Sequence, residues 1–106
     1  MKKITSNSFL DLKKKGVKFA ALTAYDCTSS LICKEAKIPL VLVGDSASMV
    51  VFGFDTTLPI NMDEMVLLTR AVKRVNDFSF VVSDMPFMSY QASTSSALKN
   101  AGMLIK

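Results

Sequence analysis

Two aspartates in this sequence each follow a strongly apolar segment. Asp45, with Ser46 next to it, comes just after residues 40–43, and Asp84 follows residues 78–83. If both segments are parallel strands of one sheet, their carboxyl ends lie at the same edge, which is where α/β barrels place their chemistry. The pair is therefore a candidate metal or substrate site. The alternative for each residue is a local turn or cap, the commoner role of a single Asp after a strand.

The side chains available limit what such a site can bind. The chain has no histidine, and Cys27 and Cys33 lie six positions apart, so we expect reduced thiols and no zinc. Oxygen ligands alone favour a hard cation such as Mg²⁺. Held by Asp45 and Asp84, this ion would leave positions for an α-keto acid, polarise its carbonyl and ease loss of the neighbouring C–H proton. The hydroxyl and N–H of Ser46 are candidates to hold the substrate carboxylate.

The segments that would position these residues alternate between helix and strand patterns. Lysines before Gly16 suit the end of a first helix, Asp26 suits an N-cap, and Asn61 with Glu64 has capping-box spacing. Residues 46–59 are expected to form a long functional loop. The predicted order is helix 8–15, strand 18–23, a helix capped by 26 and running to 37, strand 40–43, a helix opened by 61 and closed by 76–77, strand 78–83, and a helix from near 93.

This alternation predicts right-handed βαβ units and a parallel sheet. Continuous apolar strands are typical of a sheet buried on both faces, and three strands do not complete one. We therefore predict an α/β fold in which residues 1–106 are an incomplete domain: a short N-terminal helix and the first three βα units of a (β/α)₈ TIM barrel. A doubly wound domain is the alternative. The glycines form neither G-x-G-x-x-G nor a P-loop, which argues against a dinucleotide or NTP site.

The composition limits which cellular location and which binding partners we expect. Half of the residues are hydrophobic and the mean hydropathy is +0.34, but no apolar run approaches the roughly 18 residues of a membrane helix. The start of the chain lacks the apolar region of a signal peptide, so we expect a cytoplasmic protein. The net charge is +4, yet the only lysine run, residues 13–15, precedes Gly16 and is interpreted as a helix end, so neither nucleic acid nor membrane is expected as a partner.

Several segments carry a resemblance to a known family. They are LTAYD at residues 22–26, VGDS at 43–46, TLP and DEM between 57 and 65, and DMPFMSYQ at 84–91. Together they resemble ketopantoate hydroxymethyltransferase over the whole chain. DMPFMSYQ is the specific part of this resemblance, whereas VGDS alone is weak.

The resemblance implies a magnesium-dependent (β/α)₈ barrel that assembles as a cytoplasmic homo-oligomer. It implies transfer of a one-carbon unit from methylenetetrahydrofolate to α-ketoisovalerate, giving ketopantoate in the biosynthesis of pantothenate and coenzyme A. Asp45 and Asp84 would bind Mg²⁺ and the keto acid, Ser46 would contact the substrate, and Tyr25 would line the pocket. The general base would lie beyond Lys106, so residues 1–106 alone are expected to be inactive.

The sequence also departs from the family pattern. Ala47 and Ser48 stand where leucine and glycine are expected, so either the loop over the metal differs or Ser48 has ordinary backbone angles. Two other functions remain open. A different magnesium-dependent barrel enzyme acting on keto acids would share the carboxylates but should lack DMPFMSYQ. A non-catalytic, truncated chain would fit as well.

Overall fold

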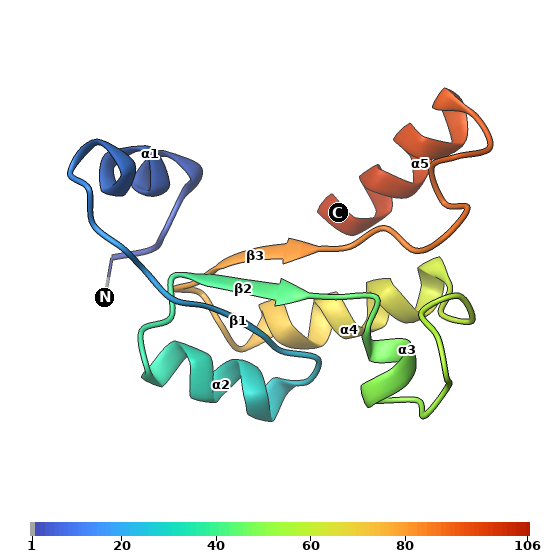
Figure 1. The fold of residues 1–106 in the computed structure, drawn as a ribbon, viewed down its shortest axis with the longest axis horizontal. Helices are drawn as coiled ribbons and strands as arrows, with labels where there is room; N and C mark the ends of the chain where they lie inside the picture. Colours follow the sequence, from blue (N-terminus) through green and yellow to red (C-terminus); the bar gives the residue numbers. More distant parts are fainter. Residues whose placement is uncertain (1) are drawn as a thin grey trace.

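The computed structural model describes residues 2–106. Within this range, a parallel sheet in the order β1-β2-β3 is joined and flanked by five helices (Figure 1). The α/β class with a parallel sheet, predicted from the alternation of patterns, is confirmed. In chain order the elements are α1 (Ser6–Lys14), β1 (Ala21–Thr23), α2 (Cys27–Glu35), β2 (Leu40–Val43), α3 (Ala47–Val50), α4 (Met62–Arg74), β3 (Phe80–Ser83) and α5 (Thr94–Ile105).

β2 is the central strand of the sheet. Val41 pairs with Leu22 of β1 and with Val81 of β3, and both neighbours run parallel to β2. All three carboxyl ends therefore lie at one edge of the sheet. The predicted bounds of β2, residues 40–43, are those of the structure.

β3 is shorter than predicted at its amino end. The sequence predicts a strand from residue 78, whereas β3 begins at Phe80. Asn76 Oδ1 accepts the N–H groups of Phe78 and Ser79 at 3.1 and 2.9 Å. These groups close a turn, so ladder pairing starts only with the Phe80 N–H, which donates to the Pro39 carbonyl at 2.8 Å.

β1 is shortened in a similar way. The prediction of a strand over residues 18–23 is wrong for its first half, because β1 begins at Ala21. In the observed register residues 18–20 would face residues 37–39. There Pro39 has no N–H to donate, and Lys37 is left-handed with φ 57°. The partner strand therefore does not extend far enough to pair with residues 18–20.

Side chains in the sequence set where the helices begin and end. The predicted capping box before α4 is confirmed: Asn61 Oδ1 accepts the Glu64 N–H at 2.9 Å, and Glu64 Oε1 accepts the Asn61 N–H at 3.1 Å. The Asp26 carboxylate accepts the Ser29 N–H at 2.8 Å and begins α2. Gly16 is left-handed, with φ 67°, as expected after a lysine-rich helix end.

Two predicted helices and one predicted loop differ from the structure. α1 begins at Ser6 instead of residue 8, because the Thr5 N–H donates to Ser8 Oγ at 3.0 Å and completes a cap. α2 ends at Glu35, before the left-handed Lys37. The segment predicted as a continuous loop over residues 46–59 contains the short helix α3.

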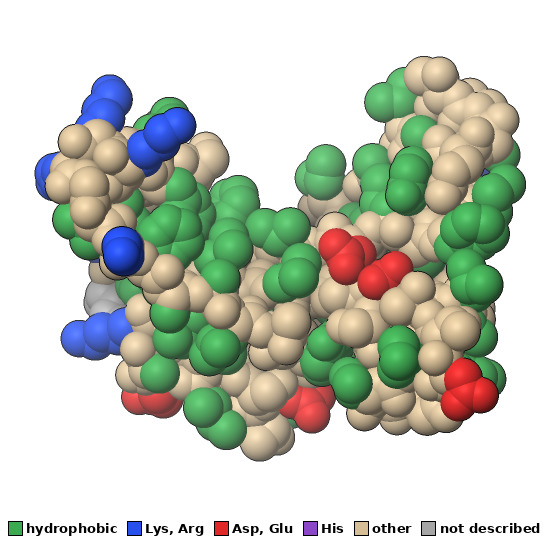
Figure 2. All heavy atoms as spheres, viewed as in Figure 1, with side chains coloured by type: hydrophobic (Ala, Val, Ile, Leu, Met, Phe, Trp, Pro, Cys, Tyr) green, Lys and Arg blue, Asp and Glu red, His purple; other side chains and the backbone are tan. Residues whose placement is uncertain are grey.

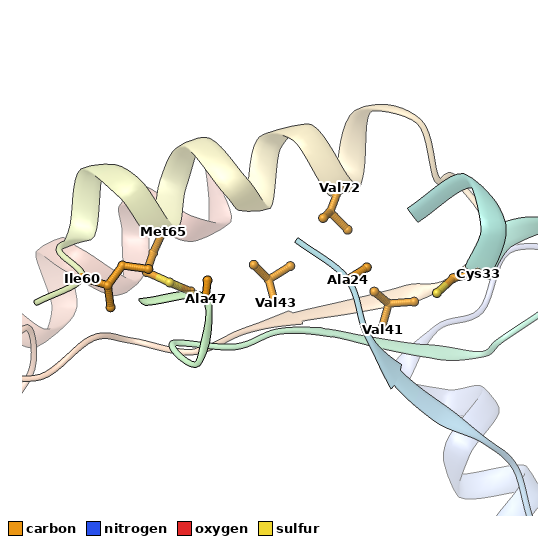
Figure 3. Close-up of a cluster of buried hydrophobic side chains, with 8 residues drawn as sticks. All are labelled: Ala24, Cys33, Val41, Val43, Ala47, Ile60, Met65 and Val72. Atoms are coloured by element: carbon orange, nitrogen blue, oxygen red, sulfur yellow. The ribbon is translucent and has the colours of Figure 1, made fainter. Parts of the chain in front are cut away.

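The hydrophobic core lies between the sheet and the helices α2 and α4 (Figures 1 and 3). Val41 and Val43 of β2 are fully buried and point toward these helices. Met65 and Val72, both of α4, pack against them. Each such buried aliphatic side chain contributes about 1.5–3 kcal/mol of transfer free energy. The buried cluster comprises Ala24, Cys33, Val41, Val43, Ala47, Ile60, Met65 and Val72.

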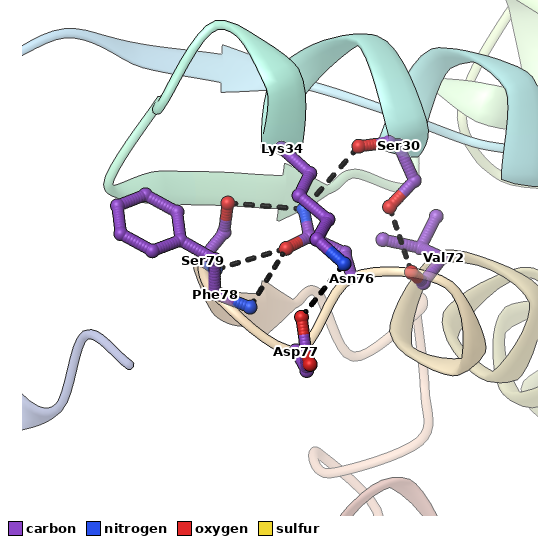
Figure 4. A network of polar contacts seen from close by, with 7 residues as sticks. All are labelled: Ser30, Lys34, Val72, Asn76, Asp77, Phe78 and Ser79. Carbon is purple, nitrogen blue, oxygen red and sulfur yellow. Dashed lines mark hydrogen bonds and ion pairs between the residues drawn. The ribbon is translucent and has the colours of Figure 1, made fainter. Parts of the chain in front are cut away.

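Buried polar side chains fasten the amino end of the sheet (Figure 4). Asn76 Nδ2 donates to the Ser30 carbonyl at 3.3 Å and to Ser79 Oγ at 3.0 Å. Ser30 Oγ donates to the Val72 carbonyl at 2.7 Å, and Ser79 Oγ donates to the Ile38 carbonyl at 2.6 Å. The network joins α2, the end of α4 and the approach to β3, at the end of the sheet opposite Asp45 and Asp84.

The other face of the sheet is only partly covered. α1 and α5 stand at its two ends and leave a hollow between them that is lined by hydrophobic side chains (Figures 1 and 2). Phe9 of α1 packs on Phe19 and Phe80, with ring centroids 4.9 and 5.5 Å away. Val82, in the middle of β3, remains 37% exposed. None of the helices in residues 2–106 combines the length and the apolar character that crossing a bilayer requires.

We expect residues 1–106, expressed alone, to self-associate through this sheet face and the free edge of β3. A few hundred Å² of apolar surface at about 25 cal/mol per Å² rivals the stability of a small domain. Val82→Lys should reduce the association measured by light scattering coupled to size exclusion. Leu67→Lys, on the outer side of α4, adds the same charge elsewhere and is the control. A monomeric wild-type chain with a cooperative melt would contradict this expectation.

Candidate active site at the carboxyl edge of the sheet

Each of the three strands delivers a polar side chain to the carboxyl edge. Tyr25 follows β1, Asp45 and Ser46 follow β2, and Asp84 follows β3. The Asp84 N–H donates to the Val43 carbonyl at 2.9 Å, which continues the ladder between β2 and β3 up to the acidic residues. Acidic side chains lie beside the apolar hollow where β2 and β3 end (Figures 1 and 2).

The structure brings Asp45 and Asp84 into direct contact. The Asp45 N–H donates to Asp84 Oδ2 at 3.0 Å. Gly44 lies next to this contact: a Cβ there would meet Asp84 Oδ2 at an ordinary 3.4 Å, but Ser46 Oγ at a tight 3.1 Å. The glycine that interrupts the apolar run therefore leaves room mainly for the Ser46 hydroxyl.

The two carboxylates carry uncompensated negative charge. Burial, followed by the charge of Asp84 and a hydrogen bond with it, raises the pKa of Asp45, and backbone N–H groups only partly oppose the rise. Between residues 2 and 106 the only side-chain ion pair is Lys34 with Asp77, 2.9 Å apart and at the other end of the sheet. A proton or a cation is therefore favoured at the Asp45–Asp84 pair.

Ser46 and Tyr25 form a second contact at the same edge. Their hydroxyl oxygens lie 2.7 Å apart, the usual distance of an O–H···O hydrogen bond, and join residues at the ends of β1 and β2. The family resemblance implies that Tyr25 lines the pocket, but it does not imply this contact. No spacing rule could have found it, because 21 residues separate the two partners.

A cavity of about 460 Å³ opens at the carboxylates. Its lining includes Tyr90 and Met85 besides the two aspartates. Both Met85 and Tyr90 belong to the DMPFMSYQ segment. A larger hollow of about 600 Å³ lies along the free edge of β3, between α4 and α5, and contains neither carboxylate. Asp45 and Asp84 thus lie at the smaller cavity, whereas Ser46 and Tyr25 are not part of its lining.

Ser48 has ordinary helical angles. It lies within α3, and of the non-glycine residues described only Lys37 and Met88 have positive φ. The side chain is fully buried, and its hydroxyl has no hydrogen-bond partner among residues 2–106. The departure at this position therefore costs polar desolvation but no left-handed strain.

Comparison with known proteins identifies the family. Residues 3–106 match the sequence model of the family described as "Ketopantoate hydroxymethyltransferase". The chain belongs to this family. The resemblance inferred from the motifs is confirmed.

Several similar curated proteins are named 3-methyl-2-oxobutanoate hydroxymethyltransferase. The chain is 49% identical over 106 residues to the protein of Carboxydothermus hydrogenoformans, with 100% of this chain and 38% of that protein covered. Identity is 46% over 105 residues with the protein of Thermobifida fusca, covering 99% and 38%. It is 45% over 97 residues with that of Nitrosopumilus maritimus, covering 92% and 35%. The chain thus spans well under half the length of these family members.

The site of this family member offers two carboxylates to a metal ion. Within residues 2–106 no group of three or more His, Cys, Asp or Glu side chains could enclose a metal. Two adjacent carboxylates without a basic partner nevertheless fit a hard dication that completes its shell with water or a chelating ligand.

Replacing Asp84 with asparagine should lower the pKa of Asp45. The variant loses the charge that opposes ionisation but keeps an oxygen that accepts the Asp45 N–H. Because the folded-state pKa is raised, stability linked to Asp45 is present below the unfolded pKa and is lost as pH rises through the folded value. In metal-free buffer, the full-length variant should therefore lose less stability than wild type between about pH 4 and pH 7.

Carbon-detected NMR titration of the Asp45 carboxyl and urea unfolding at several pH values would measure both effects. Asp77→Asn is the control, because that carboxyl is exposed and pairs with Lys34 at the other end of the sheet. An Asp45 titration that does not shift in Asp84→Asn would show that the two carboxylates are not coupled.

Ser48→Ala should stabilise the full-length protein by about 0.5–2 kcal/mol, because it removes a buried hydroxyl that has no hydrogen-bond partner among residues 2–106. Ser30→Ala is the matched control: Ser30 is equally buried, but its hydroxyl donates to the Val72 carbonyl, so its loss should cost about 1 kcal/mol. Denaturant unfolding would give both free energies. Equal destabilisation by the two substitutions would mean that Ser48 has a partner.

Proposed function

We propose that the full-length protein transfers a hydroxymethyl group from 5,10-methylenetetrahydrofolate to α-ketoisovalerate (3-methyl-2-oxobutanoate), giving ketopantoate (2-dehydropantoate). The reaction belongs to the biosynthesis of pantothenate and coenzyme A. Membership of the ketopantoate hydroxymethyltransferase family carries this proposal. The contact between Asp45 and Asp84 at the carboxyl edge supports it, because that edge is where a barrel binds its substrate.

The proposed architecture is a (β/α)₈ TIM barrel of which residues 1–106 supply the first three βα units. Three parallel strands in sequential order, with α2 and α4 on the outer face, support this assignment. The partly covered sheet face would then be the barrel interior, filled by side chains of later strands. We further propose a cytoplasmic homo-oligomer, as the family resemblance implies.

Asp45 and Asp84 are the proposed ligands of Mg²⁺, and both also contact the keto acid. When bound, the ion would supply a Lewis acid for the keto carbonyl. The two carboxylates would balance its charge. Because both line one cavity, they would leave coordination positions of the ion free for a small chelating substrate. Burial and the neighbouring Asp84 raise the pKa of Asp45, so a cation beside the pair would favour the ionised form of this carboxyl.

Ser46 is the proposed contact for the substrate carboxylate. It follows Asp45 directly, so its hydroxyl and N–H lie at the same edge as the metal ligands. A hydroxyl donor is needed there because an anionic substrate must approach two carboxylates. The alternatives are another magnesium-dependent keto-acid barrel enzyme or a chain without catalytic activity; the family match disfavours the former.

The test is turnover by the full-length protein with α-ketoisovalerate, methylenetetrahydrofolate and Mg²⁺, following ketopantoate by mass spectrometry. Asp84→Asn should weaken Mg²⁺ binding and reduce turnover together, each by about 10-fold or more, because a neutral amide is a poor ligand for a hard dication. Asp63→Asn, at the exposed start of α4, should change neither. Turnover that does not depend on Mg²⁺ or on Asp84 would refute the assignment.

A further inference from the structure

We propose that Tyr25 is a positioning residue: its phenol O–H donates to Ser46 Oγ and so directs the Ser46 proton toward the carboxylate of an α-keto acid. This inference rests on the proposed function, because it takes Ser46 as a substrate contact. It adds a residue from β1 to a site otherwise built from the ends of β2 and β3. Tyr25 then acts on the ligand only through Ser46.

The Ser46 hydroxyl does not cap the helix α3, which it precedes. Ser46 occupies the N-cap of α3, where a serine side chain ordinarily accepts a backbone N–H of the first turn. No such hydrogen bond is present, and the Met49 N–H instead donates to the Ser46 carbonyl at 2.9 Å. The hydroxyl is therefore available for the 2.7 Å contact with Tyr25.

The Ser46 hydroxyl is also confined by its neighbours. A Cβ at Gly44 would lie only 3.1 Å from Ser46 Oγ, so this oxygen sits directly against the Gly44 backbone. Tyr25 holds it from the β1 side. On the other side Asp45 is tied to Asp84 by its N–H. The two contacts thus fix the order of the side chains along the edge, with Tyr25 after β1, Asp45 and Ser46 after β2, and Asp84 after β3.

The direction of the hydrogen bond follows from acidity. Each hydroxyl has one proton, and one of the two protons is used in their mutual bond. A phenol, with a pKa of about 10, is a much stronger donor than an aliphatic alcohol, so Tyr25 donates and Ser46 accepts. The Ser46 proton is then free to point at a ligand. In the reverse arrangement Ser46 would present only lone pairs, which repel an anion.

The experiment compares Tyr25→Phe with Ser30→Ala in the full-length protein. Both remove one hydrogen-bonded hydroxyl, but the Ser30 hydroxyl donates to the Val72 carbonyl at the opposite end of the sheet, whereas the Tyr25 hydroxyl is bonded to Ser46. Calorimetry would measure the dissociation constant of Mg²⁺ alone and that of α-ketoisovalerate at saturating Mg²⁺. Ser46→Ala and the double variant Tyr25→Phe/Ser46→Ala complete a double-mutant cycle.

We expect Tyr25→Phe to weaken α-ketoisovalerate binding by about 5- to 20-fold and to leave Mg²⁺ binding within about twofold of wild type. Ser46→Ala should weaken keto-acid binding at least as much, and the double variant should bind as Ser46→Ala does, because Tyr25 has nothing left to orient. Ser30→Ala, whose lost hydrogen bond lies at the other end of the sheet, should bind both ligands as wild type.

Three results would overturn the inference. Wild-type affinity in Tyr25→Phe would show that Ser46 needs no orientation. Losses that multiply in the double variant would show that Tyr25 does not act through Ser46, and weaker Mg²⁺ binding in Tyr25→Phe would assign Tyr25 a general structural role. If instead wild type binds Mg²⁺ but not α-ketoisovalerate, the proposed function itself fails, and the inference fails with it.

Discussion

The parallel pairing of β2 with both of its neighbours is the constraint on which the rest of the structure depends. Its register sets Val41 against Leu22 and Val81 and brings the three strand ends to one edge. Val41 and Val43 are fully buried beneath α2 and α4, so a shift by one residue would expose them and bury the half-exposed Leu40 and Leu42. The same register places Asp84 opposite Gly44, so that its carboxylate accepts the N–H of the next residue, Asp45. Packing of the core and assembly of the site are therefore consequences of one pairing.

The two ends of the sheet have different tasks. At the amino end, Asn76 satisfies backbone N–H groups and joins Ser30 to Ser79, and these buried groups all find partners. At the carboxyl end, Asp45 and Asp84 contact each other, and no Lys or Arg side chain among residues 2–106 forms an ion pair with either of them. A network whose polar groups are satisfied stabilises the fold, whereas two uncompensated negative charges lower stability and favour the binding of a cation. This is the division expected of a barrel, with stability at one end and chemistry at the other.

The Tyr25–Ser46 contact extends the site across the sheet. Without it, the polar groups at the carboxyl edge come from β2 and β3 alone. With it, the end of β1 is tied to the loop that carries Asp45, and a serine in a capping position is diverted from its usual partner. Short polar side chains bond either to local backbone groups or to distant side chains. Here Ser46 has helical angles, φ −57° and ψ −13°, instead of the extended backbone of a capping residue, so its hydroxyl bonds to the distant phenol.

The sequence by itself determined what depends on near neighbours. Alternating strand and helix patterns gave the parallel α/β class, the capping box of Asn61 and Glu64 placed the start of α4, and the apolar run at residues 40–43 placed β2. These features rest on periodicity and on contacts three or four residues apart, which can be read directly. The motifs also indicated the family.

Tertiary structure alone decided what depends on distant groups. Strand lengths were set by the turn at Asn76 and by the backbone near Pro39, which residues 18–20 meet only in the folded sheet. The bond of Tyr25 to Ser46 and the burial of the Ser48 hydroxyl without a partner likewise require the strands to be in register first. A side chain's type fixes which bonds it is able to make, but only the packed chain fixes which partners come within reach.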